Sequence, residues 1–183
     1  AMREVIWPTI RGMDRDGVPF TGFLYAGLMI DAQGRPKTLE FNTRMGDPET
    51  QPILMRLKSD LLEVLLAATA GKLDEVELQW DRRVALGVVL AAGGYPQAPR
   101  KGDLITGLPP PQEDAMVFHA GTVADGEQVR TAGGRVLCVT ALADSVRQAQ
   151  TRAYDVARGI HFDGVQYRRD IGHRALRSSP SHD

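Results

Sequence analysis

Three polar residues at alternate positions, Glu40, Asn42 and Arg44, form the part of this sequence most suited to chemistry. Residues i and i+2 of an extended strand share one face. Glu40 and Asn42 are therefore expected to project together, while Leu39 and Phe41 anchor the opposite face in a core. Carboxylate and amide oxygens suit Mg²⁺ or Mn²⁺, with phosphate oxygens and water completing the coordination shell. Arg44 adds a guanidinium that fits a carboxylate or a phosphate. The pattern predicts a divalent-metal site, against the simpler alternative of a solvated strand face.

Two further carboxylates, Asp47 and Glu49, follow in the turn-like segment 46–49. They extend the polar cluster beyond the point where an ordinary strand would end. One interpretation is that they orient Arg44 or the metal without binding the ion directly. In the alternative, Asp47 caps a short helix that begins at Pro48, and Glu49 stabilises the positive end of that helix. The sequence leaves both interpretations open.

The proposed metal ligands are expected on the second strand of an antiparallel hairpin. The largely apolar run 20–30 predicts one strand, residues 31–36 a turn, and residues 37–42 the returning strand. Further on, Asp60 and Glu63 predict a capping box at the start of a helix, and Gly71 predicts its end. This helix is apolar almost all round, which predicts that it is buried.

A polar stretch at residues 72–83 predicts a boundary between two units, which we place at 1–77 and 78–183. In the second unit Ser145 and Gln148 predict the capped start of a long helix. Apolar runs and turn residues predict strands at residues 84–92, 104–105, 116–123, 128–131 and 135–142. Mixed strands with two well-defined helices predict the α+β class.

Composition excludes several classes of protein. The 183 residues carry a net charge of −1 with acids and bases interspersed, so no basic stripe points to nucleic acid. No apolar run is long enough for a membrane-spanning helix. A single cysteine, Cys138, excludes an internal disulfide framework and fits a reducing, cytoplasmic environment. Because Cys138 lies in an apolar strand, we expect a buried core thiol rather than a nucleophile.

Two other features have a structural and a functional interpretation. The segment Gly-Gly-Tyr-Pro at residues 93–96 suits a tight bend after a strand, and alternatively lets the backbone approach a substrate. His119, between Phe118 and Ala120, is expected to be a strand histidine with a hydrogen-bonded ring rather than a catalytic group.

Residues 41–52 resemble the signature of the phosphoribosylamine–glycine ligase family, also called glycinamide ribonucleotide synthetases, within the ATP-grasp superfamily. Other segments resemble the same family in the same order, at residues 11–13, 21–29, 86–96, 118–122, 133–137 and 170–172. The likeness runs from about residue 5 to about residue 176.

The resemblance implies an ATP-dependent carbon–nitrogen ligase of de novo purine biosynthesis. Such a ligase joins glycine to 5-phosphoribosylamine and gives glycinamide ribonucleotide, ADP and phosphate. The resemblance also implies that Glu40 and Asn42 bind Mg²⁺ or Mn²⁺ beside the phosphates of ATP. By analogy with other ATP-grasp enzymes, Arg44 would face those phosphates or an anionic substrate group. The implied fold is the later part of an ATP-grasp antiparallel sheet, followed by a small β-rich domain with one long helix.

The family's enzymes also have an N-terminal substrate domain and a nucleotide-clamping region, and this sequence shows no glycine-rich phosphate loop. We therefore expect the chain to need the missing N-terminal portion of the same enzyme and to be inactive alone. Two alternatives remain. One is a non-catalytic module for interdomain or subunit contacts. The other is a carboxylase-type ATP-grasp enzyme, which a dependence on bicarbonate would reveal.

Overall fold

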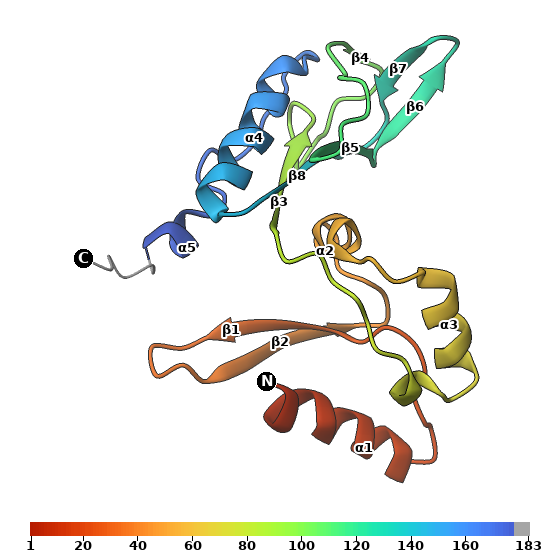
Figure 1. Ribbon diagram of the computed structural model, residues 1–183. Coiled ribbons are helices and arrows are strands. Elements are labelled where there is room, and N and C mark those ends of the chain that lie inside the picture. The colour runs from red at the N-terminus through yellow and green to blue at the C-terminus, as the bar shows by residue number, and fades with distance from the viewer. Residues whose placement is uncertain (178–183) are drawn as a thin grey trace. The chain divides into compact units, whose positions relative to one another are not determined.

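The computed structural model describes residues 1–177 as two compact units, each combining helices with antiparallel strands (Figure 1). The first unit comprises Ala1–Asp47 and Ser59–Gln79, and the second comprises Pro48–Lys58 and the chain from Trp80 onward. This mixture confirms the α+β class. Among the helices of residues 1–177, none has the length and apolar character needed to cross a membrane.

The predicted hairpin is present in the first unit. Strands β1 (Tyr25–Ile30) and β2 (Pro36–Asn42) pair antiparallel. The turn between them is closed by Asp31, whose Oδ1 accepts hydrogen bonds from the backbone N–H groups of Gln33 and Arg35 at 3.0 and 2.9 Å. This local side-chain bonding is the reason that Asp favours turns. The first strand is shorter than the predicted run because its pairing begins only at Tyr25.

The helices of the first unit are only partly as expected. The chain begins with a π-helical turn, η1 (Met2–Ile6), and helix α1 (Trp7–Arg15), neither of which the sequence analysis predicted. Helix α3 (Leu61–Thr69) has the predicted cap, because the carboxylate of Asp60 accepts a hydrogen bond from the backbone N–H of Leu62 at 2.7 Å. A short 3-10 turn, η2 (Leu73–Glu75), follows it.

The predicted burial of α3 is wrong. None of its residues is buried, and Leu62 and Leu66 remain 63% and 60% exposed. The main element packed against it is the three-residue η2, which is too small to cover an all-round apolar helix. The first unit as a whole has little core: of its hydrophobic residues only Val5 is buried.

The second unit contains two three-stranded antiparallel sheets. One has the order β3-β8-β5, with β3 (Val84–Ala91), β8 (Arg135–Ala143) and β5 (Ala115–His119). The other has the order β4-β7-β6, with β4 (Leu104–Ile105), β7 (Gln128–Thr131) and β6 (Thr122–Asp125). The prediction of one strand over residues 116–123 is wrong. A tight turn, in which the N–H of Thr122 donates to the carbonyl of Ala120 at 2.9 Å, divides it into β5 and β6.

The core of the second unit lies around the sheet β3-β8-β5. Helix α4 (Val146–Gly159) packs on β3 and β8 through its buried Ala149, Ala153 and Ala157. Its start is the predicted one, since Ser145 Oγ accepts a hydrogen bond from the N–H of Gln148 at 3.3 Å. Two further helices are short, α2 (Thr50–Arg56) and α5 (His173–Arg177).

Helix α2 covers the opposite face of that sheet from α4. A Cβ atom at Gly87 of β3 would lie 3.4 Å from Pro52 of α2 and 3.2 Å from the sulfur of Cys138. Residues on either side of Gly87 belong to the core beneath α4, as the alternation of side chains in a strand requires. Cys138 is 2% exposed, which confirms that its thiol is buried.

Candidate functional site

The strand β2 brings two of the predicted site residues together. Glu40 lies opposite Gly27 in the β1–β2 register, and Asn42 lies opposite Tyr25. The side-chain amide of Asn42 donates a hydrogen bond from Nδ2 to Glu40 Oε1 at 3.2 Å. The two side chains therefore share one face of the ribbon, as the alternation predicts. Glu40 is exposed and Asn42 is half-buried, so the pair remains accessible.

The residue opposite Glu40 leaves room for this arrangement. A Cβ atom at Gly27 would lie 3.1 Å from Cγ of Glu40 and 3.7 Å from the ring of Tyr25. That spacing to Glu40 is tighter than side chains normally tolerate, so a side chain at this position would displace the carboxylate stem. The register shifts just after Gly27, which lies opposite Glu40, while Leu28 lies opposite Thr38. This irregularity has the character of a β-bulge, a feature that often re-aims a side chain near a functional site.

The opposite face of β2 does not lie against a core. Leu39 and Phe41, which their spacing predicts to anchor the strand in a core, are 66% and 42% exposed. That expectation is wrong because the ribbon has only two strands, and the main element packed on β2 besides β1 is the short η1. The face that carries Glu40 and Asn42 is thus formed by strand pairing alone.

The other predicted site residues lie after the end of β2. The guanidinium of the exposed Arg44 donates from Nη1 to the carbonyl of Met45 at 2.9 Å, rather than to Glu40 or Asn42. Asp47 is exposed and is the last residue of the first unit's opening segment. Glu49 precedes α2 at the N-cap position, where a negative charge is favourable, although its side chain makes no capping hydrogen bond.

The donor set fits a hard divalent cation. Glu40 offers two carboxylate oxygens, and a half-turn of the Asn42 amide presents its oxygen in place of Nδ2. Within residues 1–177 no three His, Cys, Asp or Glu side chains are grouped so as to hold a metal ion. An ion bound here would therefore take most of its ligands from phosphate oxygens and water, as Mg²⁺ commonly does.

The two ambiguous features of the second unit have local structural roles. Residues 93–96 form a tight bend in which the N–H of Tyr95 donates to the carbonyl of Ala92 at 3.1 Å. Gly94 has a φ of +82°, and a Cβ atom there would lie 2.3 Å from the carbonyl oxygen of Ala98. At the end of β5 the ring of His119 is hydrogen-bonded, with Nδ1 3.1 Å from Thr122 Oγ1.

A charged cluster in the second unit is not predicted by the sequence, in which residues 72–83 resemble a polar connector. Nε and Nη2 of Arg56 donate to the backbone carbonyl of Asp81 at 3.1 and 3.0 Å. Arg83 binds the Asp81 carboxylate through Nε and Nη2, and binds Asp114 through Nη1 at 2.5 Å. Hydrogen bonds from Arg83 hold the pKa of Asp81 well below its usual range. The feature of the sequence that could have indicated this cluster is the dense run of charged residues that follows Trp80.

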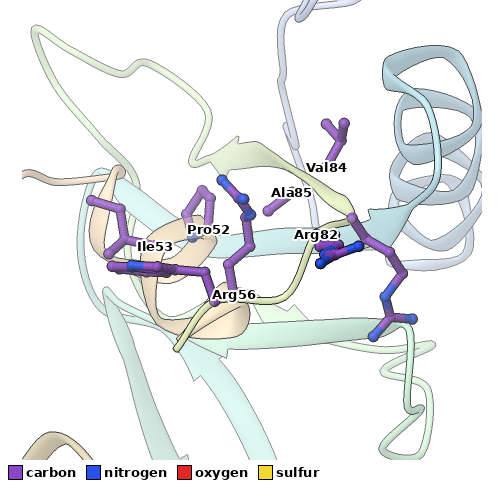
Figure 2. A pocket seen from close by; sticks show the side chains of 8 residues that line it. Pro52, Ile53, Arg56, Arg82, Val84 and Ala85 are labelled. Carbon is purple, nitrogen blue, oxygen red and sulfur yellow. The ribbon is translucent and has the colours of Figure 1, made fainter. Parts of the chain in front are cut away.

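This cluster borders a cavity of about 550 Å³. Figure 2 shows Pro52, Ile53 and Arg56 projecting from α2. Arg82 lies in the chain just before β3, and Val84 and Ala85 are the first residues of that strand. Trp80 and Arg83 complete the lining. The cavity lies entirely within the second unit.

Comparison with known families gives the class of the chain. Residues 1–50 match the family model described as the ATP-grasp (A) domain of phosphoribosylglycinamide synthetase. The ribbon that carries Glu40 and Asn42 thus lies in a region matched to an ATP-grasp domain. Residues 85–174, which hold both sheets of the second unit except the first residue of β3, match the model described as the C domain of phosphoribosylglycinamide synthetase. The chain belongs to the phosphoribosylglycinamide synthetase family.

Individual relatives agree with this family. The chain is 65% identical over 176 residues to phosphoribosylamine–glycine ligase of Ralstonia nicotianae. The aligned residues cover 96% of this chain and 42% of the relative. It is 61% identical over 177 residues to the same ligase of Escherichia coli O157:H7, an alignment that covers 96% of this chain and 41% of the relative. A crystal structure of phosphoribosylamine–glycine ligase from Thermotoga maritima superimposes with a TM-score of 0.79 at 39% identity, covering 93% of this chain and 42% of that one. The chain therefore spans about two fifths of the length of these relatives.

More distant structures share the fold alone. The biotin carboxylase subunit of pyruvate carboxylase has a TM-score of 0.58 at 19% identity, covering 86% of this chain and 36% of that one. At such identity the likeness is one of fold and transfers no chemistry.

Proposed function

We propose that this chain is part of an ATP-dependent ligase that joins glycine to 5-phosphoribosylamine, giving glycinamide ribonucleotide, ADP and phosphate. The relatives named above, at 61% and 65% identity, are phosphoribosylamine–glycine ligases. The single observation that carries the proposal is the pairing of Glu40 with Asn42 on one accessible face of the β1–β2 ribbon. This ribbon lies in the region matched to an ATP-grasp domain.

Glu40 and Asn42 would hold Mg²⁺ or Mn²⁺. Their hard oxygen donors and the exposure of Glu40 suit an ion that is shared with the phosphates of ATP. The bound ion would neutralise charge that develops on the transferred phosphoryl group, a contribution of several kcal/mol in order-of-magnitude terms. Glu40, Asn42 and their strand pairing fix the position at which this charge is neutralised.

The chemistry explains why a nucleotide is needed. Glycine carries a carboxylate, which is a poor acyl donor because oxide would have to leave. Transfer of the γ-phosphoryl group of ATP to a glycine oxygen gives glycyl phosphate and ADP. The amine of 5-phosphoribosylamine then attacks the carbonyl, forms the amide bond and releases phosphate. Catalysis of the first step is mainly positioning and electrostatic stabilisation.

Arg44 is proposed to orient an anionic group of the reactants. Its guanidinium is exposed and, among residues 1–177, bonds through Nη1 to the neutral carbonyl of Met45 alone. Its remaining N–H donors are therefore available to a phosphate or carboxylate. Asp47 and Glu49 are proposed to orient Arg44 or the ion. For Glu49, favourable interaction with the start of α2 is an equally simple role.

The proposed reactants are ATP, glycine and 5-phosphoribosylamine, and the proposed location is the cytoplasm, which a single buried thiol suits. The proposed division into residues 1–77 of the ATP-grasp domain and 78–183 of the C-terminal domain follows the polar stretch 72–83. The remaining portion of the same enzyme is the proposed partner. Large exposed apolar side chains in the first unit support this, among them Leu39, Leu62 and Leu66.

A chimeric enzyme tests the proposal. In it, this chain replaces the matching segment of the E. coli O157:H7 ligase, to which it is 61% identical. We expect ADP release that requires both glycine and 5-phosphoribosylamine. A folded chimera that releases ADP only with bicarbonate would favour the carboxylase alternative. A folded chimera that binds ATP but shows no turnover would favour a contact module.

A further inference from the structure

The cavity between α2 and the start of β3 combines an apolar wall with cations. Pro52, Ile53 and Trp80 supply flat or branched apolar surface, and Trp80 is 42% exposed. Three arginines, Arg56, Arg82 and Arg83, also line it. Its volume of about 550 Å³ falls within the range typical of small-molecule sites.

Two of these arginines are held in fixed positions by the fold. Arg56 is bound through Nε and Nη2 to the carbonyl of Asp81, while the N–H of Asp81 donates to the carbonyl of Arg56 at 2.7 Å. Arg83 uses its donors on Asp81 and Asp114. This network ties the end of α2 to the segment that carries Trp80, so the walls of the cavity are pre-organised.

Some arginine N–H groups of the cavity are not used by this network and are available to bind an anion. Within residues 1–177, Arg82 makes no hydrogen bond or ion pair, and Nη1 of Arg56 has no partner. Three arginines line the cavity, and the two carboxylates that pair with Arg83 belong to Asp81 and Asp114. Lys58 adds a further positive charge near Asp81. The local balance is therefore positive and favours an anionic ligand.

From these observations we propose that the cavity is a binding site for a nucleoside monophosphate. A guanidinium is suited to a phosphate, which Arg82 and the free side of Arg56 would bind. A nucleobase offers a flat face that can stack on the exposed indole of Trp80. The cavity is larger than a phosphate ion alone requires, and its apolar wall has no role toward such an ion.

Titration with AMP in the absence of metal tests this site. The 183-residue chain contains two tryptophans, so a Trp7→Phe background makes Trp80 the sole indole reporter. We expect a saturable change in Trp80 fluorescence and a matching dissociation constant from calorimetry. Arg82→Gln should weaken binding about tenfold, the effect of losing a hydrogen bond to a charged group. Adenosine and inorganic phosphate, which each lack one half of the ligand, should bind at least about tenfold more weakly than AMP.

Two matched variants locate the binding. Arg147→Gln removes an exposed arginine of α4 outside this cavity and should leave the AMP affinity unchanged. Glu40→Gln, in the proposed metal site, should also leave it unchanged, which separates this site from the proposed catalytic one. The proposal is overturned if Arg82→Gln and Arg147→Gln bind AMP equally. It is equally overturned if neither fluorescence nor calorimetry detects binding up to about 10 mM AMP.

Discussion

Gly27 and Glu40 lie opposite each other on the β1–β2 ribbon so closely that a methyl group on Gly27 would be 3.1 Å from Cγ of Glu40. The backbone of Gly27 is not in the left-handed region, so alanine is compatible with the strand itself. What a side chain here would disturb is the stem of Glu40, and through it the carboxylate that lies beside Asn42.

We therefore expect Gly27→Ala in the chimeric ligase to weaken Mn²⁺ binding while the fold is retained. The loss should be about threefold or more, smaller than the roughly 10–100-fold typical of removing a group that supports a metal ligand. Paramagnetic resonance of Mn²⁺ in the presence of ADP measures it. Gly12→Ala is the control, since no atom lies within 4 Å of a Cβ at Gly12. Equal Mn²⁺ affinity in both variants would show that Gly27 does not position Glu40.

Removal of the Glu40 charge should have a larger effect. Glu40→Gln keeps the shape of the side chain but replaces an anionic ligand by a neutral amide, so Mn²⁺ affinity and metal-dependent ADP release in the chimera should fall at least about tenfold. Glu77→Gln, at an exposed site in the same unit, is the matched control. Unchanged turnover of Glu40→Gln at limiting Mg²⁺ would rule out the proposed ligand.

The ion pair between Asp81 and Arg83 predicts that the stability of the fold depends on pH. Hydrogen bonds from Arg83 lower the pKa of Asp81 in the folded state, so the stability they contribute is present above the ordinary carboxyl pKa of about 4. It is lost as the pH falls through the lower folded-state value. Asp81→Asn should therefore lower the melting temperature at neutral pH, and the gap to the parent chain should narrow below about pH 4.

Melting temperatures measured at closely spaced pH values test this dependence. The control is Glu127→Gln, at an exposed position of the β6–β7 turn in the same unit, which should melt like the parent chain. A gap between Asp81→Asn and the parent that stays constant into acid would mean that ionisation of Asp81 contributes no stability.

Local chemistry explains what could be predicted from the sequence. The hairpin followed from the turn residues around Asp31 and from the alternation that places Glu40 beside Asn42. The long helix followed from Ser145 and Gln148, which are three residues apart. Each of these features is decided by residues close together along the chain.

Features that depend on distant residues could not be predicted. Leu39 and Phe41 are apolar at the right spacing for a buried face, yet burial requires a covering element, and alternation says nothing about one. The cluster around Asp81 joins residues that are far apart along the chain. Arg56 is 25 positions from Asp81, and Arg83 is 31 positions from Asp114. In the sequence alone these charges resemble a solvated connector.

The chain on its own is expected to show no ligase turnover. It spans about two fifths of the length of the ligases it matches, and its sequence shows no glycine-rich loop for the phosphates of a nucleoside triphosphate. Release of ADP by the purified 183-residue chain should equal the background rate with glycine and 5-phosphoribosylamine both present. Release above background that requires both substrates would contradict the proposal that the rest of the enzyme is needed.

The loop after β4 offers a stability test within the second unit. Gly107 has a φ of +74°, and a Cβ atom there would lie 1.9 Å from the carbonyl oxygen of Gly159, the last residue of α4. Gly107→Ala therefore combines backbone strain with a clash against a carbonyl that cannot easily move, and should cost more than about 2 kcal/mol of unfolding free energy.

Gly126→Ala separates the two causes, because Gly126 has a φ of +60° but no atom within 4 Å of its Cβ position. It should carry only the conformational cost, about 1 kcal/mol. Urea unfolding, followed by Trp80 fluorescence in the Trp7→Phe background, measures both variants. If the two variants unfold at the same midpoint, the close approach of Gly107 to the end of α4 contributes nothing to the stability of this unit.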